Sequence, residues 1–264
     1  MLELLAGNHF VAGVVASVIA GAGATTLGAV PVFLLNGMRP RLNNALLSFA
    51  AGVMLAATVF SLLLPALDAA EARIGSRIQA TLGVIGALCI GAVVLAFAHR
   101  VLPHEHFTKG REGQDGSRLA RIWLFVIAIA LHNFPEGLSV GVGAASGDAR
   151  AGLGVMVGIG LQNLPEGLSV AVALLSQGYR RIFAFAIATL TGVVEILGGV
   201  VGAGAVVLAA GLLPWALAFA AGAMLFVISD EIIPETHRPG FAEGATAALF
   251  AGFGLMMFLD AALA

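Results

Sequence analysis

The chain has 264 residues, of which 59% are hydrophobic and only 11% are charged. A soluble domain carries roughly 25% charged residues. These side chains are therefore too few to cover a soluble globule, and the mean hydropathy of +1.00 indicates that lipid is the main solvent. The formal net charge of −2 argues against a nucleic-acid partner, and the single cysteine, Cys89, excludes a disulfide framework.

Eight apolar runs are each long enough to cross a hydrocarbon core of roughly 30 Å as a helix. The sequence therefore predicts an all-α integral membrane protein, a single transmembrane domain over residues 1–264. We expect its helices at about 9–35, 43–66, 78–102, 120–144, 151–175, 182–209, 212–232 and 242–262. Only Gly211 and Pro214 mark the boundary between the sixth and the seventh helix. The one long polar loop, 103–118, is rich in His, Gly and charge.

Basic residues are distributed unevenly between the two sets of loops. With the N-terminus outside, the outer loops hold Arg73, Arg77 and Arg150, and the inner loops hold the other ten of the 13 Lys and Arg residues. Cytoplasmic loops carry an excess of Lys and Arg, so we expect both termini outside and the His-containing loop in the cytoplasm. A count of seven helices would break this pattern, so the charges also favour eight.

An internal repeat occupies the fourth and fifth predicted helices. Residues 131–140 read LHNFPEGLSV and residues 161–170 read LQNLPEGLSV. Consecutive spanning helices run in opposite directions, so the two copies are inverted in the membrane. Inverted repeats around a substrate site near the midplane are typical of transporters.

Each copy of the repeat carries three polar side chains that are costly in a membrane and usually functional. They are His132, Asn133 and Glu136 in the fourth helix, and Gln162, Asn163 and Glu166 in the fifth. Residues four apart share a helix face. At about 1.5 Å per residue, both clusters lie ~16 Å deep, near the middle of the core, where they can meet.

Four more residues are expected at this depth. Pro135 and Pro165 each free the carbonyl four residues earlier as a candidate ligand, unless they serve only as kinks. Glu195 lies midway along the sixth helix and could carry a proton or belong to the site. Met54 lies in the second helix, and a lone Met there would by itself be interpreted as packing.

The chemistry of these groups points to a metal ion. Imidazole and carboxylate together with a thioether suit zinc, cadmium or another late divalent ion, whereas Mg²⁺ and Ca²⁺ prefer oxygen alone. The carboxylates of Glu136 and Glu166 would neutralise one divalent ion in a medium that penalises net charge. The alternative is a buried polar network that only stabilises the bundle.

This pattern resembles the ZIP family of divalent-metal transporters, and its bacterial GufA-type branch in particular. The match covers nearly the whole chain and is most specific at 132–137 and 162–167. It extends to 51–55, to 60–65 with Asp68, to Glu195 and to 231–237. The resemblance implies eight helices in a 3+2+3 arrangement, with the first and last three related by inversion around the central pair.

The resemblance also implies two adjoining metal sites that share Glu136 and Glu166. The main transport site would contain Met54, His132, Glu136, Gln162 and Glu166, and the second site Asn133, Glu136, Asn163, Glu166 and Glu195. Met54 thereby becomes a candidate ligand. Asn163 stands where some relatives carry Asp, and an amide is a weaker ligand than a carboxylate. We therefore expect the second site to bind metal poorly or only to assist.

Two further groups could extend the metal path. Ser61 and Asp68 lie toward the outer end of the second helix and could meet the ion at the entrance, although Asp68 could equally be an exposed loop acid. Candidates for a cytoplasmic release or sensing site are His99, His104, His106, Asp230 and Glu231. The two loop histidines could equally be incidental, since short His tracts bind metal opportunistically.

The resemblance implies transport by an elevator-like alternating access. The fourth and fifth helices, with the first and eighth, would carry the ion into the cytoplasm against the other four. We expect zinc as the cargo, with cadmium, iron and manganese left open, no cofactor and no enzymatic activity. The resemblance further implies the bacterial inner membrane and a homodimer.

Three other classes of protein share some of these features with a carrier. An intramembrane metal-dependent hydrolase is disfavoured, because no H-E-x-x-H motif occurs and only one His lies at mid-depth. A channel with the acidic residues as a selectivity ring stays open, since an inverted repeat does not exclude it. A metal-sensing receptor would need a sizeable soluble domain, which the sequence lacks.

Overall fold

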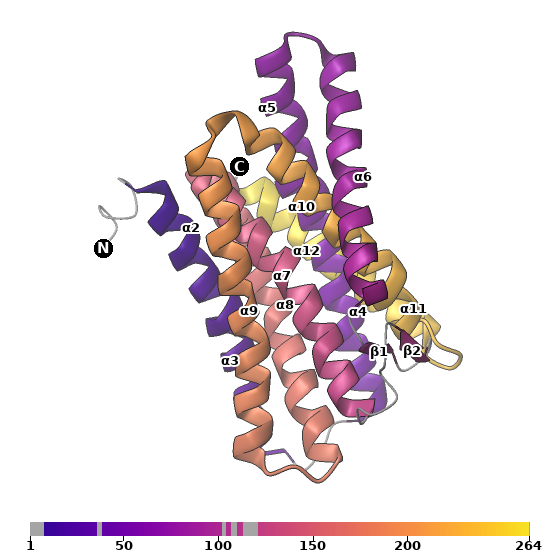
Figure 1. Cartoon of the computed structure of the whole chain (residues 1–264). Coiled ribbons are helices and arrows are strands. Elements are labelled where there is room, and N and C mark those ends of the chain that lie inside the picture. Colours follow the sequence, from indigo (N-terminus) through magenta and orange to yellow (C-terminus); the bar gives the residue numbers. More distant parts are fainter. Residues whose placement is uncertain (1–7, 36–38, 102–103, 107–109, 113–120, 264) are drawn as a thin grey trace.

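The computed structural model describes residues 8–35, 39–101, 104–106, 110–112 and 121–263. Over these residues the chain forms eight long helices, three of them interrupted, and one very short β-hairpin (Figure 1). The first helix consists of α2 (His9–Ser17), the π-helical η1 (Val18–Gly23), α3 (Ala24–Ala29) and η2 (Val30–Phe33). The second consists of α4 (Pro40–Ala57), the π-helical η3 (Thr58–Leu63) and α5 (Leu64–Ile74).

The remaining helices follow with short connections. The third is α6 (Arg77–Val101), and the strands β1 (His104–His106) and β2 (Gly110–Glu112) pair antiparallel after it. The fourth, fifth and sixth are α7 (Arg121–Ala145), α8 (Ala149–Ser176) and α9 (Arg181–Leu208), and a short 3-10 turn, η5 (Ala210–Leu212), follows. The seventh consists of α10 (Leu213–Val227), the π-helical η6 (Ile228–Ile232) and α11 (Ile233–Thr236), and the eighth is α12 (Ala242–Leu263).

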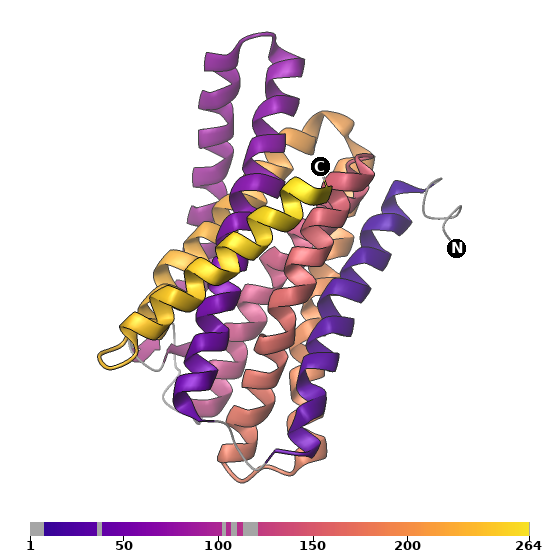
Figure 2. The same cartoon turned by 180° about the vertical axis from the view of Figure 1, so that it is seen from behind.

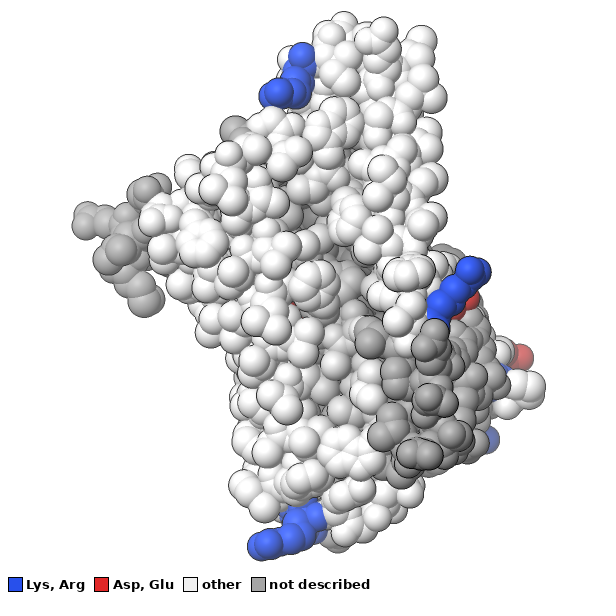
Figure 3. Space-filling view, in the orientation of Figure 1, with Lys and Arg blue, Asp and Glu red and all other residues white. Residues whose placement is uncertain are grey.

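The helices have the length and composition of membrane spans. Within the described residues, seven of the eight are long and apolar enough to cross a membrane. The other one, α7, has 25 residues and lies among the spans in the middle of the bundle (Figure 1). The face in Figure 3 shows Lys and Arg at its two ends and at one edge, beside residues that are not described. The predicted all-α, eight-helix membrane fold is confirmed.

Two helices run past the ends expected from hydropathy. The second continues beyond residue 66 to Ile74 and stops at Gly75, whose φ of 76° is a left-handed conformation. This extra length packs against α6, and the two helices project together beyond their neighbours (Figure 1). Arg77, at the start of α6, forms ion pairs with Asp68 at 3.2 Å and Glu71 at 2.5 Å. The seventh helix similarly continues to Thr236.

The long helices pack in two groups that meet along one interface. The first group contains α2, α3, α7, α8 and α9, and the second contains α4, α5, α6, α10 and α12. They meet where α4 contacts α8 and α10 contacts α7. Within the second group α12 packs on α4 and α10 on α6. Glycine allows both approaches, because a Cβ on Gly52 or Gly222 would lie 1.9 Å from a carbonyl oxygen of the partner helix.

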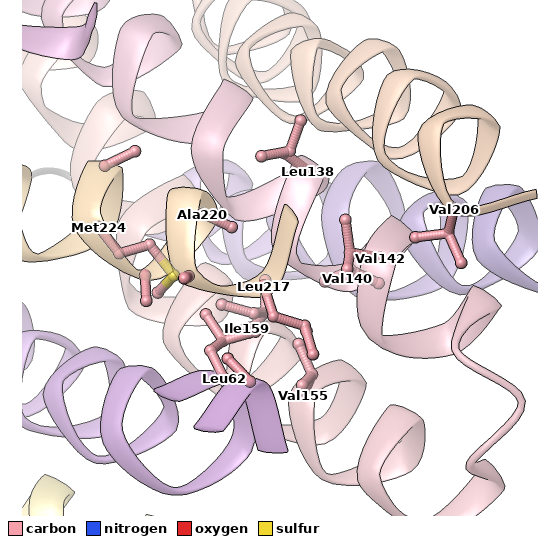
Figure 4. Close-up of a cluster of buried hydrophobic side chains, with 14 of the residues drawn as sticks. Leu62, Leu138, Val140, Val142, Val155, Ile159, Val206, Leu217, Ala220 and Met224 are labelled. Carbon is pink, nitrogen blue, oxygen red and sulfur yellow. The ribbon is translucent and has the colours of Figure 1, made fainter. Parts of the chain in front are cut away.

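Both termini lie at one end of the bundle, called here the termini side, and the β-hairpin lies toward the other, the hairpin side (Figures 1 and 2). The largest apolar cluster lies toward the termini side and includes Leu62, Leu138, Val155, Leu217 and Met224 (Figure 4). It draws side chains from both helix groups. A second cluster joins only α3, α7, α8, α9 and η2 toward the hairpin side.

Candidate metal site

The polar residues of the repeat are buried in the middle of the bundle. His132 is 5% exposed and Glu166 8%, and the other residues predicted at this depth are at most 2% exposed. Those others are Met54, Asn133, Glu136, Gln162, Asn163 and Glu195. Burying so many polar groups in a lipid-facing protein is costly unless they bind one another or a ligand.

Several of these groups have no hydrogen-bond partner in the described part of the chain. Both polar atoms of Asn133, Glu136 and Gln162 lack one, as do Asn163 Oδ1 and Glu166 Oε1. Gln162 lies beside Glu136 and Asn133 beside Glu166, but without normal hydrogen-bond geometry. The carboxylates of Glu136 and Glu166 also lie close enough to repel each other. Unpaired oxygens and two neighbouring carboxylates are the environment that a divalent cation stabilises.

Glu195 is held differently, by hydrogen bonds from its neighbours. Asn163 Nδ2 lies 2.9 Å from each of its carboxylate oxygens, and Thr25 Oγ1 donates to one of them at 3.4 Å. The same Asn163 amide also donates to the carbonyl of Ala20 at 2.7 Å. The predicted second site therefore has two of its members bonded to each other, which explains why an amide suits position 163: a carboxylate there would face that of Glu195.

Glu231, predicted on the cytoplasmic path, reaches the central histidine. Its Oε2 contacts His132 Nε2, and its side chain is 1% exposed. Glu231 lies in the π-helical segment η6, and its neighbour Asp230 is half-buried. Two residues that the sequence assigned to separate sites are thus in direct contact across the interface between the two helix groups.

The main site is not assembled as a cluster of charged ligands. In the described residues, no three His, Cys, Asp or Glu side chains are grouped closely enough to hold a metal ion. His132 is paired with Glu231, and the other candidate donors include the amide of Gln162 and the thioether of Met54. Met54 is buried in α4 as part of the apolar cluster. Binding therefore requires side chains to rearrange around the ion.

The predicted entrance residues are not brought together. Ser61 is buried, and its hydroxyl donates to Asp260 Oδ1 at 2.7 Å, which joins the second helix to α12. Asp68 lies two turns farther along, on an exposed face, paired with Arg77. Asp260 was missed because a single acid near a helix end is common at a membrane interface.

The three predicted histidines of the cytoplasmic path lie near the end of α6 and in the strand that follows it. His99 lies near the end of α6, and His104 and His106 are the first and last residues of β1. The side chains of all three lie outside the described part of the chain. Most of the predicted 103–118 loop also lies outside it.

One further buried methionine was missed. Met224 in α10 is fully buried, and its Sδ lies 3.1 Å from Ser139 Oγ of α7. A second repeat would have found it: residues 49–55 read FAAGVML and residues 219–225 read FAAGAML, so Met224 corresponds to Met54. A π-helical segment begins four residues after each methionine, at Thr58 and Ile228.

The chain is similar to known transport proteins over most of its length. Residues 100–260 match the family model described as ZIP zinc transporter. The zinc transporter GufA of Myxococcus xanthus is 44% identical over 252 residues, which cover 96% of this chain and 99% of the relative. The zinc transporter ZIPB of Bordetella bronchiseptica is 46% identical over 244 residues, covering 92% and 79%.

The similarity extends to animal proteins. The zinc transporter ZIP11 of Homo sapiens is 34% identical over 322 aligned residues, covering 91% of this chain and 94% of the relative. All these relatives are named as transporters and none as an enzyme. The predicted resemblance is confirmed: this chain belongs to the ZIP zinc transporter family and is a multi-span membrane transport protein, not an enzyme.

Proposed function

We propose that this protein carries zinc, and also cadmium, iron or manganese, across the bacterial inner membrane into the cytoplasm by alternating access. The observation that carries the proposal is the set of buried, unpaired polar atoms on α7 and α8. Two inverted copies of one motif supply them from opposite directions. A structural network would satisfy its own hydrogen bonds, whereas a cargo site has to leave them open.

The charge of the site fits a divalent cargo. Glu136 and Glu166 together balance one such ion, and His132, Gln162 and Met54 add neutral donors of intermediate softness. Glu231 Oε2 contacts His132 Nε2, one of these donors. An arriving ion would displace Glu231, which could then accompany it toward the cytoplasm as the predicted release residue.

The direction of transport rests on the proposed orientation. Arg39, Arg41, Arg180, Arg181 and Arg238 all belong to connections on the hairpin side. The positive-inside rule then favours a cytoplasmic hairpin side and outer termini. Zinc reaching the site from the termini side and leaving past Glu231 would enter the cytoplasm.

The packing of the helices suggests which of them move. We propose that the group of α2, α3, α7, α8 and α9 carries the ion, against a scaffold formed by the second group. This assignment takes the sixth helix into the moving group in place of the eighth, because α9 packs along α7 whereas α12 packs on α4.

A mismatch between the two repeats indicates how far the groups would move. A Cβ on Gly158 of α8 would lie 3.7 Å from that of Ala57 in α4. The two helices are antiparallel, so Met54, three residues before Ala57, is level with Leu161, three residues after Gly158. The equivalent methionine, Met224, meets α7 at Ser139, whose equivalent in α8 is Ser169. Met54 is thus level with position 161, whereas Met224 contacts the position equivalent to 169. The two contacts differ by about eight residues, or roughly 12 Å along a helix.

Exchanging these two registers gives a second arrangement of the same helices. Met54 would then contact Ser169, Met224 would be level with Leu131, and the α7–α8 group would lie roughly 12 Å nearer the termini side. Inverted-repeat carriers alternate between two such arrangements of their repeats. The repeat mismatch therefore supports a carrier over a channel.

The present arrangement suits a state open toward the cytoplasm. On the termini side of the site, the apolar cluster seals the interface between the groups (Figure 4). On the hairpin side, the interface contains polar contacts, including a 2.7 Å hydrogen bond from Ser169 to Asn43. A cavity of about 540 Å³ also lies on the hairpin side, within the second group, between the start of α4 and the start of α12.

The proposal is tested by zinc uptake into proteoliposomes. His132→Ala and Glu166→Ala are expected to lower the initial rate to below about a tenth of the wild-type value, since each removes a proposed ligand. The matched controls are His9→Ala and Glu243→Ala, which change the same residue types at exposed positions. Equal rates for all five proteins, at equal reconstitution, would refute the central site. Uptake that saturates with zinc supports a carrier, and a linear dependence contradicts it.

A further inference from the structure

Met224 occupies a position that is neither purely apolar nor purely structural. Its Sδ lies 3.1 Å from the hydroxyl of Ser139 on α7 and 3.9 Å from that of Thr58 on η3. All three side chains are fully buried. The sulfur thus lies at the contact between the two helix groups. It touches α7 at Ser139, which follows Glu136 by three residues.

The sulfur of Met224 accepts only weak, shared hydrogen bonds. Ser139 Oγ donates to Met224 Sδ at 3.1 Å and to the carbonyl of Pro135 at 2.8 Å. Thr58 Oγ1 donates to Met224 Sδ at 3.9 Å and to the carbonyl of Met54 at 2.7 Å. Each hydroxyl has one proton, and a carbonyl oxygen is a stronger acceptor than a thioether, so a metal ion would replace these contacts to sulfur at little cost.

We propose that Met224 is the thioether ligand of the transported ion when the site faces outward, as Met54 is when it faces inward. The inference rests on the proposed function and on the two repeats. In the present register Met54 is level with Leu161, next to Gln162. In the exchanged register Met224 is level with Leu131, next to His132. The ion is handed from one scaffold methionine to its symmetry mate as α7 and α8 move between them.

The handover has a chemical consequence for selectivity. A thioether is a soft donor and contributes more to binding of a soft ion such as cadmium than of a harder one. Because each methionine binds the ion in a different state of the carrier, Met224 governs loading from outside and Met54 governs the inward-facing site. Loss of Met224 therefore changes the external KM of cells that take up metal from the medium.

The test compares cadmium and zinc uptake by intact cells that express Met224→Leu, Met224→Cys and Met256→Leu. Leucine conserves volume and apolarity, so folding should be retained. Met256 is a fully buried methionine on α12 and serves as the matched control. Met224→Leu is expected to raise the external KM for cadmium about tenfold, and that for zinc less. Met224→Cys restores a soft donor and is expected to keep the cadmium preference.

The outcomes separate this inference from the proposed function. An unchanged ratio of cadmium to zinc KM in Met224→Leu, or an equal shift in Met256→Leu, assigns Met224 to packing while wild-type uptake still supports transport. If the wild type takes up neither metal, the proposed function and the handover both fall. A lower cadmium preference in Met224→Leu alone, recovered in Met224→Cys, supports the handover.

Discussion

Asn163 is the residue at which this chain departs from the pattern of some ZIP relatives. Its amide bonds both oxygens of Glu195, with Thr25 as a further donor to that carboxylate. The bonds neutralise nothing, but they satisfy a buried carboxylate that would otherwise need a cation. Two members of the second predicted site, Asn163 and Glu195, are therefore bonded to each other, and we expect that site to bind metal weakly.

Replacing Asn163 by Asp should open this site. The new carboxylate would face that of Glu195 and repel it, and a second divalent ion would relieve the repulsion. We expect Asn163→Asp to bind two zinc ions per chain in purified protein, against one for the wild type, as counted by isothermal titration and elemental analysis. Asn163→Ala removes the amide without adding charge and should stay at one. Two equally occupied ions in the wild type would contradict this account.

The mid-depth residues could be predicted because the membrane makes them conspicuous. His132, Glu136 and Glu166 stand out in apolar runs, and their cost alone suggests a function. Met224 carries no such signal, since a methionine in an apolar run resembles packing until the two FAAG segments are aligned. The contact of Glu231 with His132 was also beyond the sequence, because it depends on how two separate helices meet.

At the scale of elements, hydropathy located the helices better than their ends. The second helix passes residue 66 because its polar end pairs with α6 and with Arg77, not because lipid surrounds it. Hydropathy also could not predict which helices pack together, since every span is apolar. It depends on close approaches such as that of Gly137, where a Cβ would lie 1.9 Å from the carbonyl oxygen of Glu195 in α9.

The two registers of α7 and α8 on the scaffold can be trapped by disulfides. Cys89 is the single native cysteine, so a Cys89→Ser background makes engineered pairs unambiguous. Ser139→Cys with Met224→Cys should cross-link in the present arrangement, because the side chains of Ser139 and Met224 are in contact. Ser169→Cys with Met54→Cys should cross-link in the exchanged arrangement.

Both pairs are expected to form in membranes under mild oxidation, each measured by a shift in gel mobility after cleavage of the connecting loop. Single-cysteine variants control for links between chains. Formation of the first pair alone, under every condition of metal and oxidant, would mean that the groups do not slide, and would leave the elevator movement without support.

At the scale of the whole molecule, the orientation decides whether the protein imports or exports. Figure 3 shows Lys and Arg at the two ends of the visible face and at one edge. The termini side holds the α5–α6 turn at Gly75 and the α7–α8 turn at Gly147, both with positive φ, and the hairpin side holds the α8–α9 turn at Gly178. These turns give one reporter position on each face.

Labelling single cysteines with a membrane-impermeant maleimide in intact cells measures the orientation directly. In the Cys89→Ser background, Ser76→Cys is expected to react and Gln177→Cys to react only after the membrane is permeabilised. Both positions are in turns, so the substitutions should disturb no packing. The reverse pattern would place the hairpin side outside. Zinc leaving past Glu231 would then exit the cell, and the same alternating carrier would have to be interpreted as an exporter.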